Sequence, residues 1–587
     1  MPNIHYTISI EDPIAHIFKV TLTADFIAKG QIFRLPTWIP GSYMIRDFAR
    51  NIVSLNVNQK KDKVVKIDSH SWQVKEDLNA PVIEYLVYAW DLSVRGAHLD
   101  DQHAFFNGTS LFLEPVGMLV DQFIVEFQKP RENYAKDWQL ATSMPRLDEQ
   151  VNYEFGRFYS RSYDELLDHP FEAGKLDIAE FEVAGVPHAL VVVGEHQGDL
   201  PRIVQDLERI CKHQVEFFSE LPSCVERYLF LVNVLPSGYG GLEHRSSTAL
   251  HCSYSELPKQ FHEMSDDYIN FLTLCSHEYF HTWNIKQIKP SVFLPYDLTR
   301  EVHTDQLWIF EGFTSYYEDR LVYEAGVIDQ KQYLKLLAQA ITRVHRGRGR
   351  HLQSVAESSF DAWTRFYKQD ESAPNVIVSY YTKGKLIALC LDLLIRQTSQ
   401  DKLSLNDIMI ELWRNYGIIS KGLASGELEA IFKQRFGSKF LDFFNRFVYS
   451  TDELPLQELL ALVGVKVQWN NSSSLKTLSG DDDVQVSLGA TLKQTSDGVE
   501  VVTVLYGSNA YELGLCSGDK VVALNEYSVD IASLEKRFAW LSPGEQVSMH
   551  IFRRGKLLHY CSTVKASEKL TCDLRVDESL EIEVQWW

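Results

Sequence analysis

Long hydrophobic runs are missing from this sequence. Nowhere do about 18 consecutive apolar residues occur, so the chain offers no candidate for a membrane-spanning helix. Residues 1–8 also lack the basic and apolar stretches that make up a secretory signal peptide. We therefore expect a protein of the cytoplasm.

Cysteine, glycine and proline are scarce as well. The 8 cysteines are scattered and form no CxxC pair, which fits buried, reduced thiols better than a disulfide framework. Glycine (31) and proline (19) are too few for a fibrous or mainly disordered chain of 587 residues. With 45% hydrophobic and 12% aromatic residues, the composition is globular, and the length suggests about four domains.

Basic residues are outnumbered by acidic ones. The 58 Lys and Arg residues stand against 79 Asp and Glu, and the net charge of −21 repels nucleic-acid phosphates. We therefore expect no nucleic-acid partner. The one strongly basic run, residues 345–351, has no aromatic residues among its charges. It is typical of a solvated loop or of a structural ion-pair donor.

Hydrophobic periodicity predicts a β-rich start and a mixed middle. Apolar residues alternate or run in short stretches before about residue 165, as at 17–23 and 83–88, which favours an N-terminal β-sandwich. Buried strands are predicted at 188–193 and 228–234, with a helix between them near 200–221.

The second half of the chain begins helical and ends in strands. Helical patterns dominate residues 265–462, the serine-rich acidic stretch 470–483 indicates a linker, and strand patterns return at 499–504 and 547–552. We therefore predict a multidomain α+β fold. Its predicted parts are a β-sandwich (1–165), an α/β domain (166–325), a helical subdomain (326–468), a linker (469–484), a β-domain (485–567) and a β-like tail (568–587).

The strongest chemical signal is the pentapeptide HEYFH at 277–281, in a predicted apolar helix. Histidines at i and i+4 face the same side of a helix, where they can bind one Zn²⁺, and Glu278 between them can reach a metal-bound water. Zinc acidifies that water and polarises a carbonyl group, and the glutamate accepts the proton. The alternative is that His277 and His281 pack in the core without a metal.

A catalytic zinc site needs a third protein ligand and one open position. Glu311 follows in the apolar segment 308–318, and buried carboxylates are rare unless they are paired or coordinating. Glu318, two helical turns further along the same face, is predicted to hydrogen-bond a ligand histidine, unless it is an ordinary surface glutamate.

These two segments together resemble the gluzincin metallopeptidases, the clan of thermolysin and aminopeptidase N. Residues 38–51 (WIPGSYMIRDFARN) resemble the N-terminal domain signature of the glycyl aminopeptidase family. The segment GGLEH at 240–244 is similar to the substrate-amine motif GxMEN of aminopeptidase N, and YYTKG at 380–384 is similar to the clan's YEKG. The motifs occur in the family's order and cover most of the chain.

The resemblance implies a thermolysin-like α/β catalytic domain and one Zn²⁺ per chain, held by His277, His281 and Glu311. It also implies that Tyr381 stabilises the transition state, because a phenol can donate a hydrogen bond to the oxyanion of a tetrahedral intermediate. Glu243 would pair with the ammonium group of the substrate.

The two glycines before Glu243 belong to the same motif. Gly240 and Gly241 permit a close approach of substrate to the backbone. Three positions depart from the clan's motifs, and these are Leu242, His244 and Thr382.

Residues 485–567 resemble a PDZ domain like those of bacterial proteases. The stretch 507–515 would build its short helix and 518–522 the following strand. Such domains add an extended peptide to a sheet edge and capture its carboxylate with backbone N–H groups, here in the loop that contains Leu488, Gly489 and Ala490. A PDZ domain used only for packing is the alternative. We expect the tail from residue 570 to dock back onto the body.

The sequence thus predicts a zinc aminopeptidase that acts on peptides and, by resemblance, prefers small N-terminal residues, glycine or alanine. One alternative is a zinc endopeptidase, in which Glu243 would have no function. Another is a catalytically idle scaffold that binds peptides through the PDZ domain, and the intact set of zinc ligands argues against it.

Overall fold

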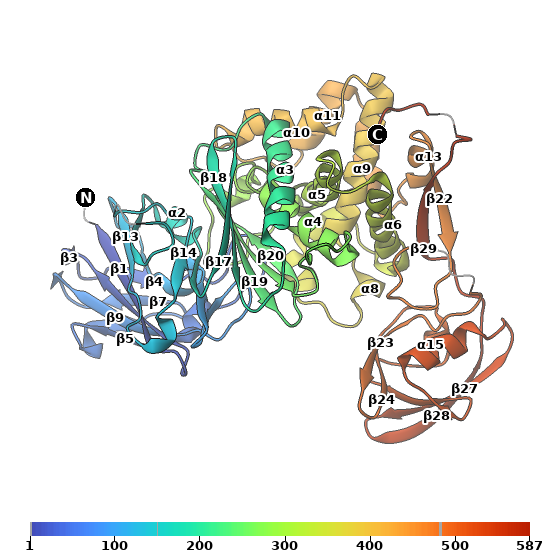
Figure 1. The fold of residues 1–587 in the computed structure, drawn as a ribbon, viewed down its shortest axis with the longest axis horizontal. Coiled ribbons are helices and arrows are strands. Elements are labelled where there is room, and N and C mark those ends of the chain that lie inside the picture. The colour runs from blue at the N-terminus through green and yellow to red at the C-terminus, as the bar shows by residue number, and fades with distance from the viewer. Residues whose placement is uncertain (1–2, 149–150, 481–483, 581) are drawn as a thin grey trace. The chain divides into compact units, whose positions relative to one another are not determined.

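The computed structural model describes residues 3–148, 151–480, 484–580 and 582–587, and Figure 1 shows their fold. The chain divides into two compact units. The first unit comprises Met1–Val302, Glu324–Val327 and Trp413–Gly422. The second comprises His303–Tyr323, Ile328–Leu412 and Leu423–Trp587. Every helix among the described residues is too short or too polar to span a bilayer.

Three sheets make up most of the N-terminal part of the first unit. The predicted strands at 17–23 and 83–88 are β2 (Ile17–Thr23) and β9 (Val82–Tyr88), whose side chains alternate between the core and the surface. Residues from all three sheets share one hydrophobic core. The predicted N-terminal β-domain is therefore confirmed.

The strands of these sheets come from distant parts of the chain. In the six-stranded sheet, β2 and β9 lie beside β1 (Ile4–Asp12), β5 (Ile52–Val57), β13 (Phe123–Phe127) and β15 (Gly156–Ser160). One four-stranded sheet contains β10 (Ala97–Leu99), β11 (His103–Phe106), β16 (Phe171–Gly174) and β14 (Gln139–Ala141). The other contains β12 (Glu114–Pro115), β4 (Ile32–Arg34), β7 (Ser71–Val74) and β6 (Val64–Lys66).

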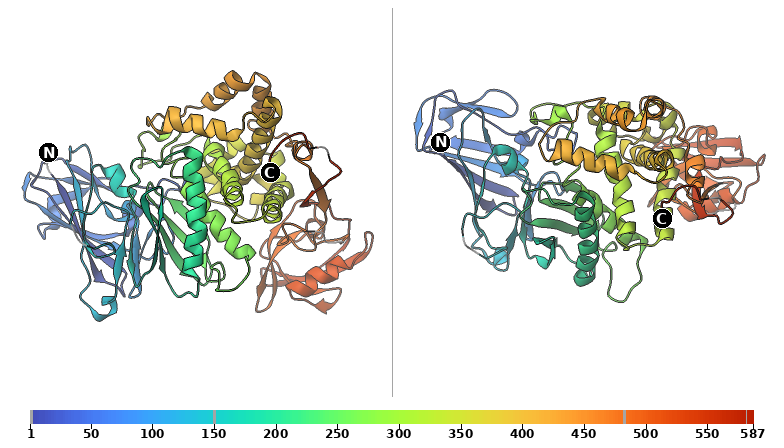
Figure 2. Two further views of the ribbon diagram at one scale, coloured as in Figure 1. Left: turned by 45° about the horizontal axis from the view of Figure 1, so that its top comes forward. Right: turned by 90° about the horizontal axis from the view of Figure 1, so that it is seen from above.

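A five-stranded mixed sheet follows in the first unit, in the order β17-β18-β19-β21-β20. Its strands are β17 (Asp177–Val183), β18 (Val186–Val193), β19 (Tyr228–Leu235), β21 (Ser247–Ser253) and β20 (Gly240–Glu243). The three inner strands are parallel, and the two edge strands are antiparallel to them. Helices α3 (Leu200–Phe218) and α4 (Asp266–Phe280) lie alongside this sheet (Figure 2). Both strands and the helix predicted for this region are confirmed.

Helices dominate the second unit up to residue 461, as predicted. Its long central helix is α9 (Tyr380–Ser399), which contacts α6 (Gln330–Arg346). The further helices are α5 (Phe313–Glu324), α7 (Val355–Phe360), α8 (Ala373–Val376), α10 (Leu405–Leu412), α11 (Glu427–Phe436), α12 (Lys439–Phe447) and α13 (Leu456–Ala461). α9 also packs against α7, α10 and α13, so it forms the core of the helical region.

The basic run 345–351 begins with the last two residues of α6, and two of its arginines donate to neighbouring groups. Arg346 donates from Nη2 to Oγ1 of Thr571 at 2.7 Å. Arg350 donates from Nε to the carboxylate of Glu453 at 2.9 Å. Of the two alternatives that the sequence left open, a solvated loop and a structural ion-pair donor, these contacts favour the second.

A separate β-module follows within the second unit and has its own hydrophobic core. Its elements are β23 (Ala490–Thr495), β24 (Gly498–Val504), α14 (Asn509–Glu512), β25 (Lys520–Leu524), β26 (Tyr527–Ser528), α15 (Ile531–Ala539), β27 (Gln546–Arg553) and β28 (Lys556–Thr563). The predicted strands at 499–504 and 547–552 and the short helix within 507–515 are present. Its assignment as a PDZ domain stays a prediction.

The C-terminal tail returns to the helical region. Strand β29 (Thr571–Val576) pairs antiparallel with β22 (Val465–Asn470), which precedes the β-module in the chain. Trp586 is 2% exposed, and its carbonyl oxygen accepts a hydrogen bond from Arg320 at 2.6 Å. The predicted docking of the tail is therefore confirmed. Residues 481–483 of the predicted linker lie outside the described residues.

Candidate metal centre and substrate site

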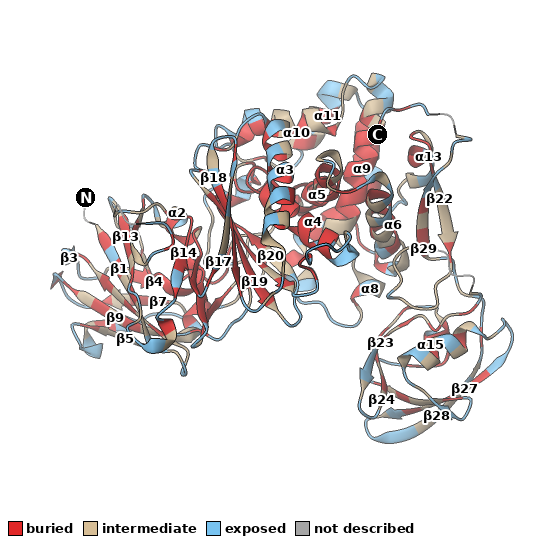
Figure 3. Ribbon diagram, in the orientation of Figure 1, coloured by how far each residue is buried: buried red, intermediate tan, exposed pale blue. Residues whose placement is uncertain are grey.

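Helix α4 holds the HEYFH pentapeptide in the interior of the first unit. The helix begins after Ser265, whose hydroxyl accepts a hydrogen bond from the backbone N–H of Tyr268. Every residue from Phe271 to Phe280 is buried, and Figure 3 shows the helix as buried over most of its length. A helix that is apolar on all sides packs in a core, so the polar groups at its C-terminal end are held rigidly.

The two histidines bring their ring nitrogens together, as their spacing predicts. Nε2 of His277 lies 2.9 Å from Nε2 of His281, and the two ring planes are nearly perpendicular. Nδ1 of His281 donates a hydrogen bond to the backbone carbonyl of Asn284 at 2.8 Å. With its proton on Nδ1, His281 keeps a free lone pair on Nε2, on the side where the two Nε2 atoms meet. A metal ligand needs such a lone pair.

Two carboxylates converge on this histidine pair within the first unit. One oxygen each of Glu243 and Glu278 and one ring nitrogen of His281 lie within 4.8 Å of one another. Glu243 ends strand β20, whereas Glu278 comes from α4. A Cβ atom at Gly241 would overlap Oε1 of Glu278. The absence of a side chain at Gly241 therefore lets strand β20 lie directly against the carboxylate of Glu278. This is a more specific role than the close approach of substrate that the sequence suggested for this position.

The segment 38–51 lies against Glu243. A side chain at Gly41 would overlap both carboxylate oxygens of Glu243, and Gly41 has a φ of +90°, which favours glycine. Arg95 donates from Nη2 to the carbonyl oxygen of Gly241 at 3.3 Å. Sequence reasoning did not assign roles to Gly41 or Arg95. The Pro-Gly pair at 40–41 was a signal for a turn, but nothing in it indicated a contact with Glu243.

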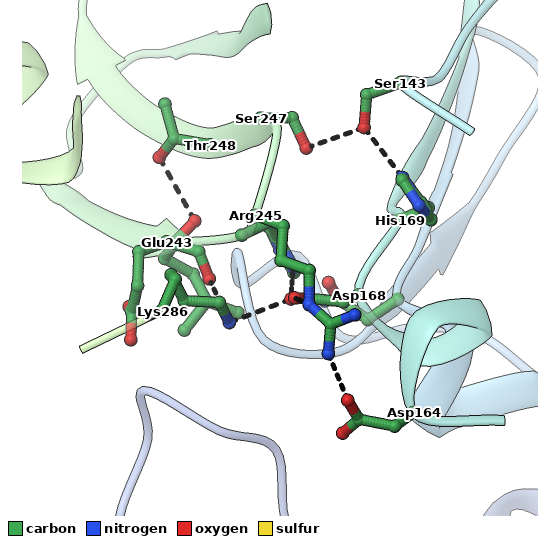
Figure 4. A network of polar contacts seen from close by, with 12 residues as sticks. Ser143, Asp164, Asp168, His169, Glu243, Arg245, Ser247, Thr248 and Lys286 are labelled. Carbon is green, nitrogen blue, oxygen red and sulfur yellow. Dashed lines mark hydrogen bonds and ion pairs between the residues drawn. The ribbon is translucent and has the colours of Figure 1, made fainter. Parts of the chain in front are cut away.

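A buried ion network fixes the chain just after Glu243 (Figure 4). The carboxylate of Asp168 accepts from Lys286 at 2.8 Å, from Arg245 at 3.0 Å and from Nδ1 of His244 at 3.1 Å. Burial alone would raise the pKa of Asp168, but Lys286, His244 and Arg245 hold it well below its usual range. Nζ of Lys286 also donates to the carbonyl oxygen of Glu243 at 3.4 Å. The carboxylate of Asp168 therefore stays charged and holds Lys286, which restrains the backbone of Glu243.

In the second unit, two crossing helical segments carry Glu311 and Tyr381. The π-helix Trp308–Gly312 contains Glu311, which is 2% exposed, and continues directly into α5. A Cβ atom at Gly384 of α9 would lie 2.8 Å from Cα of Gly312. The backbones of the π-helix and α9 thus touch at Gly312 and Gly384. This contact holds the two elements that carry Glu311 and Tyr381 against each other.

Two neighbouring tyrosines begin α9 and differ in burial. Tyr380 is fully buried, whereas Tyr381 is half-buried and its hydroxyl lies 3.4 Å from that of Tyr367. Burial, Tyr367 and Glu311 raise the pKa of Tyr380 well above its usual value. Tyr381 is therefore the more accessible of the two tyrosines.

Glu318 lies on α5 beside a buried lysine. Nζ of Lys385 is 3.4 Å from its carboxylate and also contacts Asp319. The predicted hydrogen bond from the ring N–H of a ligand histidine to the carboxylate of Glu318 stays a prediction.

The glycine contact in the second unit gives a direct prediction. Gly384→Ala should force α9 away from the π-helix, because the added methyl group meets backbone atoms that cannot turn aside. We expect a destabilisation of about 1–3 kcal/mol, together with losses of zinc and of kcat/KM. Gln397→Ala, at an exposed position on the same helix, is the control. A Gly384→Ala variant with the melting temperature and the kcat/KM of the wild type would show that the contact does not position the site.

Two models of protein families match the N-terminal part and the middle of the chain. Residues 5–175 match the Peptidase M61 N-terminal domain, and residues 270–387, from α4 into α9, match the M61 glycyl aminopeptidase model. A solved structure of an aminopeptidase N family protein from Idiomarina loihiensis is 42% identical over 98% of each chain, with a TM-score of 0.95. The chain belongs to the M61 glycyl aminopeptidase family. It is a zinc metallopeptidase, as the sequence predicted.

A more distant structure is also similar to this M61 family member. The M1 zinc metallopeptidase from Deinococcus radiodurans is 12% identical, covers 78% of this chain and 94% of its own, and has a TM-score of 0.46. No curated protein matches the chain.

Proposed function

We propose that the chain is an aminopeptidase that releases small N-terminal residues, glycine or alanine, from peptides. The observation that carries this proposal is the convergence of Glu243 and Glu278 on His281. An endopeptidase needs a proton acceptor such as Glu278 beside its metal. It has no use for a second buried carboxylate at the same place, whereas an aminopeptidase needs one to bind the free α-ammonium group.

His277, His281 and Glu311 are the proposed ligands of one zinc ion per chain. The donor set fits zinc, because two neutral imidazoles and one carboxylate leave a fourth position open for water or substrate. The orientation of the two Nε2 atoms and the hydrogen bond that fixes the tautomer of His281 support it. Bound zinc would acidify a water molecule and polarise the scissile carbonyl group.

The remaining chemistry belongs to side chains of this chain. Glu278 takes the proton of the attacking water and delivers it to the departing amine, since it is a carboxylate beside the histidine pair. Tyr381 donates its hydroxyl proton in a hydrogen bond to the oxyanion that forms at the scissile carbonyl. Its half-buried position, beside the fully buried Tyr380, supports this assignment.

Glu243 is the proposed receptor for the substrate's ammonium group. It is 4% exposed, and the backbone of Gly41 covers its carboxylate. In a site this dry, a charge-assisted hydrogen bond keeps most of its strength.

Glu243→Ala tests this proposal. We expect kcat/KM for free-amine substrates to fall about 10- to 150-fold, the equivalent of roughly 1.5–3 kcal/mol for a hydrogen bond to a charged group. N-acetylated substrates, which lack the charge, should be poor for the wild type and almost unaffected by the substitution. Glu182→Ala, at an exposed position on β17, is the matched control. Equal losses for free and acetylated substrates would contradict the role of Glu243.

For the C-terminal β-module we propose binding of a peptide C-terminus at residues 488–490. Leu488 and Ala490 belong to the core of the module, whereas Gly489 borders a cavity of about 520 Å³. Arg348 and Lys565 also line this cavity, and their positive charges suit a carboxylate.

An internal deletion separates this binding from hydrolysis. Replacing residues 485–567 with a flexible linker, while retaining the docked tail, should leave kcat/KM for short reporter substrates largely unchanged. Binding of a labelled peptide with a free C-terminus, followed by fluorescence anisotropy, should be lost. The same peptide with an amidated C-terminus is the control and should not bind the full chain. Inactivation of a deletion variant that melts cooperatively would mean that the module completes the active site.

A further inference from the structure

A second cluster of metal-ligand side chains lies in the N-terminal part of the first unit, on elements that the proposed active site does not use. His98 is on β10 and His103 on β11, and Asp100 is in the short connection between these paired strands. One ligand atom from each of the three residues lies within 4.8 Å of the others.

One separation within the cluster is close to that of a tetrahedral zinc site. Oδ2 of Asp100 is 3.2 Å from Nε2 of His98. Ligands about 2.0–2.2 Å from a tetrahedral ion are about 3.3–3.6 Å from each other. Nδ1 of His103 is 3.8 Å from the other carboxylate oxygen, Oδ1, so binding of an ion would draw His103 closer to Oδ2. Two imidazoles with one carboxylate are a common set of zinc ligands.

The ligands are held in place before any ion binds. Oδ1 of Asp100 accepts from the backbone N–H groups of Gln102 at 2.7 Å and of His103 at 2.9 Å, which leaves Oδ2 as a ligand atom. The rings of His98 and His103 are stacked with centroids 4.8 Å apart, and Trp90 lies 4.8 Å from His98 on another side. The connection therefore needs little ordering to bind an ion.

The groups around the two rings can fix the tautomers that metal binding needs. The side-chain amide of Asn233, on β19, lies 3.3 Å from Nε2 of His103. An amide can present its oxygen to this nitrogen by turning through 180°, and Nε2–H then donates to it, which leaves the lone pair of Nδ1 for the ion.

A hydrogen-bonded cluster of His98, Asp100 and His103 without an ion is the competing explanation. It leaves two polar atoms of buried side chains unexplained. Nδ1 of His98 and Oε1 of Glu172 have no hydrogen-bond partner among the described residues. The two side chains are 3% and 2% exposed, and both line the same cavity of about 10 Å³. A histidine that binds metal through Nε2 carries its proton on Nδ1 and donates it to an outer carboxylate. Glu172 lines the same cavity as His98 and would become this acceptor after a small movement of either side chain, because the two atoms do not hydrogen-bond in the structure.

We propose that His98, Asp100 and His103 bind a second zinc ion, with Glu172 orienting His98 from outside the ligand set. The ion fastens the connection between β10 and β11, and its role is structural. This inference does not depend on the proposed aminopeptidase activity.

The metal content of the full-length protein tests the proposal. After equilibration with buffered Zn²⁺ and removal of weakly bound metal, plasma mass spectrometry should give close to two zinc ions per chain. His98→Ala and His103→Ala should each reduce this to about one, as should His277→Ala, and the combination of His98→Ala with His277→Ala should hold none. Gln102→Ala, exposed and between the ligands, should keep both ions.

Two further measurements guard against misfolding of the histidine variants. Asp100→Asn, which preserves size and both backbone hydrogen bonds, should also lose one ion. In His277→Ala, Co²⁺ should give the visible absorption of a tetrahedral site, and His98→Ala in the same background should abolish it. Each variant is compared with the wild type by circular dichroism.

The possible results separate this proposal from the proposed function. One zinc ion per chain that is lost in His277→Ala and retained in His98→Ala would overturn the second site and leave the first intact. Two ions that persist in His98→Ala and Asp100→Asn would also overturn it. One ion lost in His98→Ala but retained in His277→Ala would support the second site and contradict the active-site assignment.

Discussion

Glu278→Gln is expected to lower kcat by a factor of about 10²–10⁴ while the protein keeps its zinc, because this is the usual contribution of a general base. The glutamine amide occupies the same volume against Gly241, but it cannot accept the proton of the attacking water. The measurement is a pair of values for each purified variant, kcat on a free-amine reporter and zinc per chain.

Two variants make this result specific. Glu311→Ala should lose zinc as well as activity, because it removes a proposed ligand. Glu208→Gln, on an exposed part of α3, should change neither value. A Glu278→Gln enzyme with the wild-type rate would show that another group is the base, and one without zinc would show that Glu278 helps to hold the metal.

Tyr381→Phe should lower kcat by about 10²–10³ with little change in KM, because an oxyanion donor acts mainly in the transition state. The ring and its packing beside Phe366 are retained, so the change isolates the hydroxyl group. Initial rates over a wide range of substrate concentration separate the two constants.

Tyr380→Phe is the matched control for this prediction. The hydroxyl of Tyr380 is fully buried beside Tyr367 and Tyr381 and is not the proposed oxyanion donor, so its removal should lower kcat much less than that of the Tyr381 hydroxyl. A larger loss of kcat in Tyr380→Phe than in Tyr381→Phe would exchange the two roles. An effect of Tyr381→Phe on KM alone would mean that Tyr381 only binds substrate.

Local periodicity explains which parts of the fold could be predicted. The strands at 17–23 and 228–234 and the helix near 200–221 depend on the alternation or helical spacing of neighbouring residues, and each is present. His277 and His281 bring their rings together for the same kind of reason, because they are one helical turn apart.

Contacts between distant segments could not be predicted from such patterns. Asp168 and Lys286 are 118 positions apart in the sequence, and neither stands in a motif. Gly41 belongs to a segment that resembles a family signature, but its contact with Glu243 depends on how a turn outside the strands packs against the end of β20. A sequence pattern records the burial of a residue and not the identity of its partner, so these supports of the site were found only in the structure.

Two glycines of the motifs have structural roles that the sequence did not indicate. The predicted close approach of substrate at residues 240–241 stays a prediction, and the structure adds that Gly241 lies against Glu278. For the glycine of YYTKG the sequence indicated only that the motif resembles one of a known family. The structure shows that Gly384 allows the backbone of α9 to touch that of the π-helix. In both places the glycine marks a contact between protein segments that positions a functional side chain.

The central claim is that this zinc peptidase removes residues one at a time from a free N-terminus. The direct test is mass spectrometry of the products that the wild-type enzyme forms over time from a peptide beginning Ala-Gly-Ala, with and without an N-acetyl group. We predict a ladder of products that lose residues in order from the free peptide, no cleavage of the acetylated peptide, and no products after chelation until zinc is restored. Internal fragments from both peptides would contradict the account.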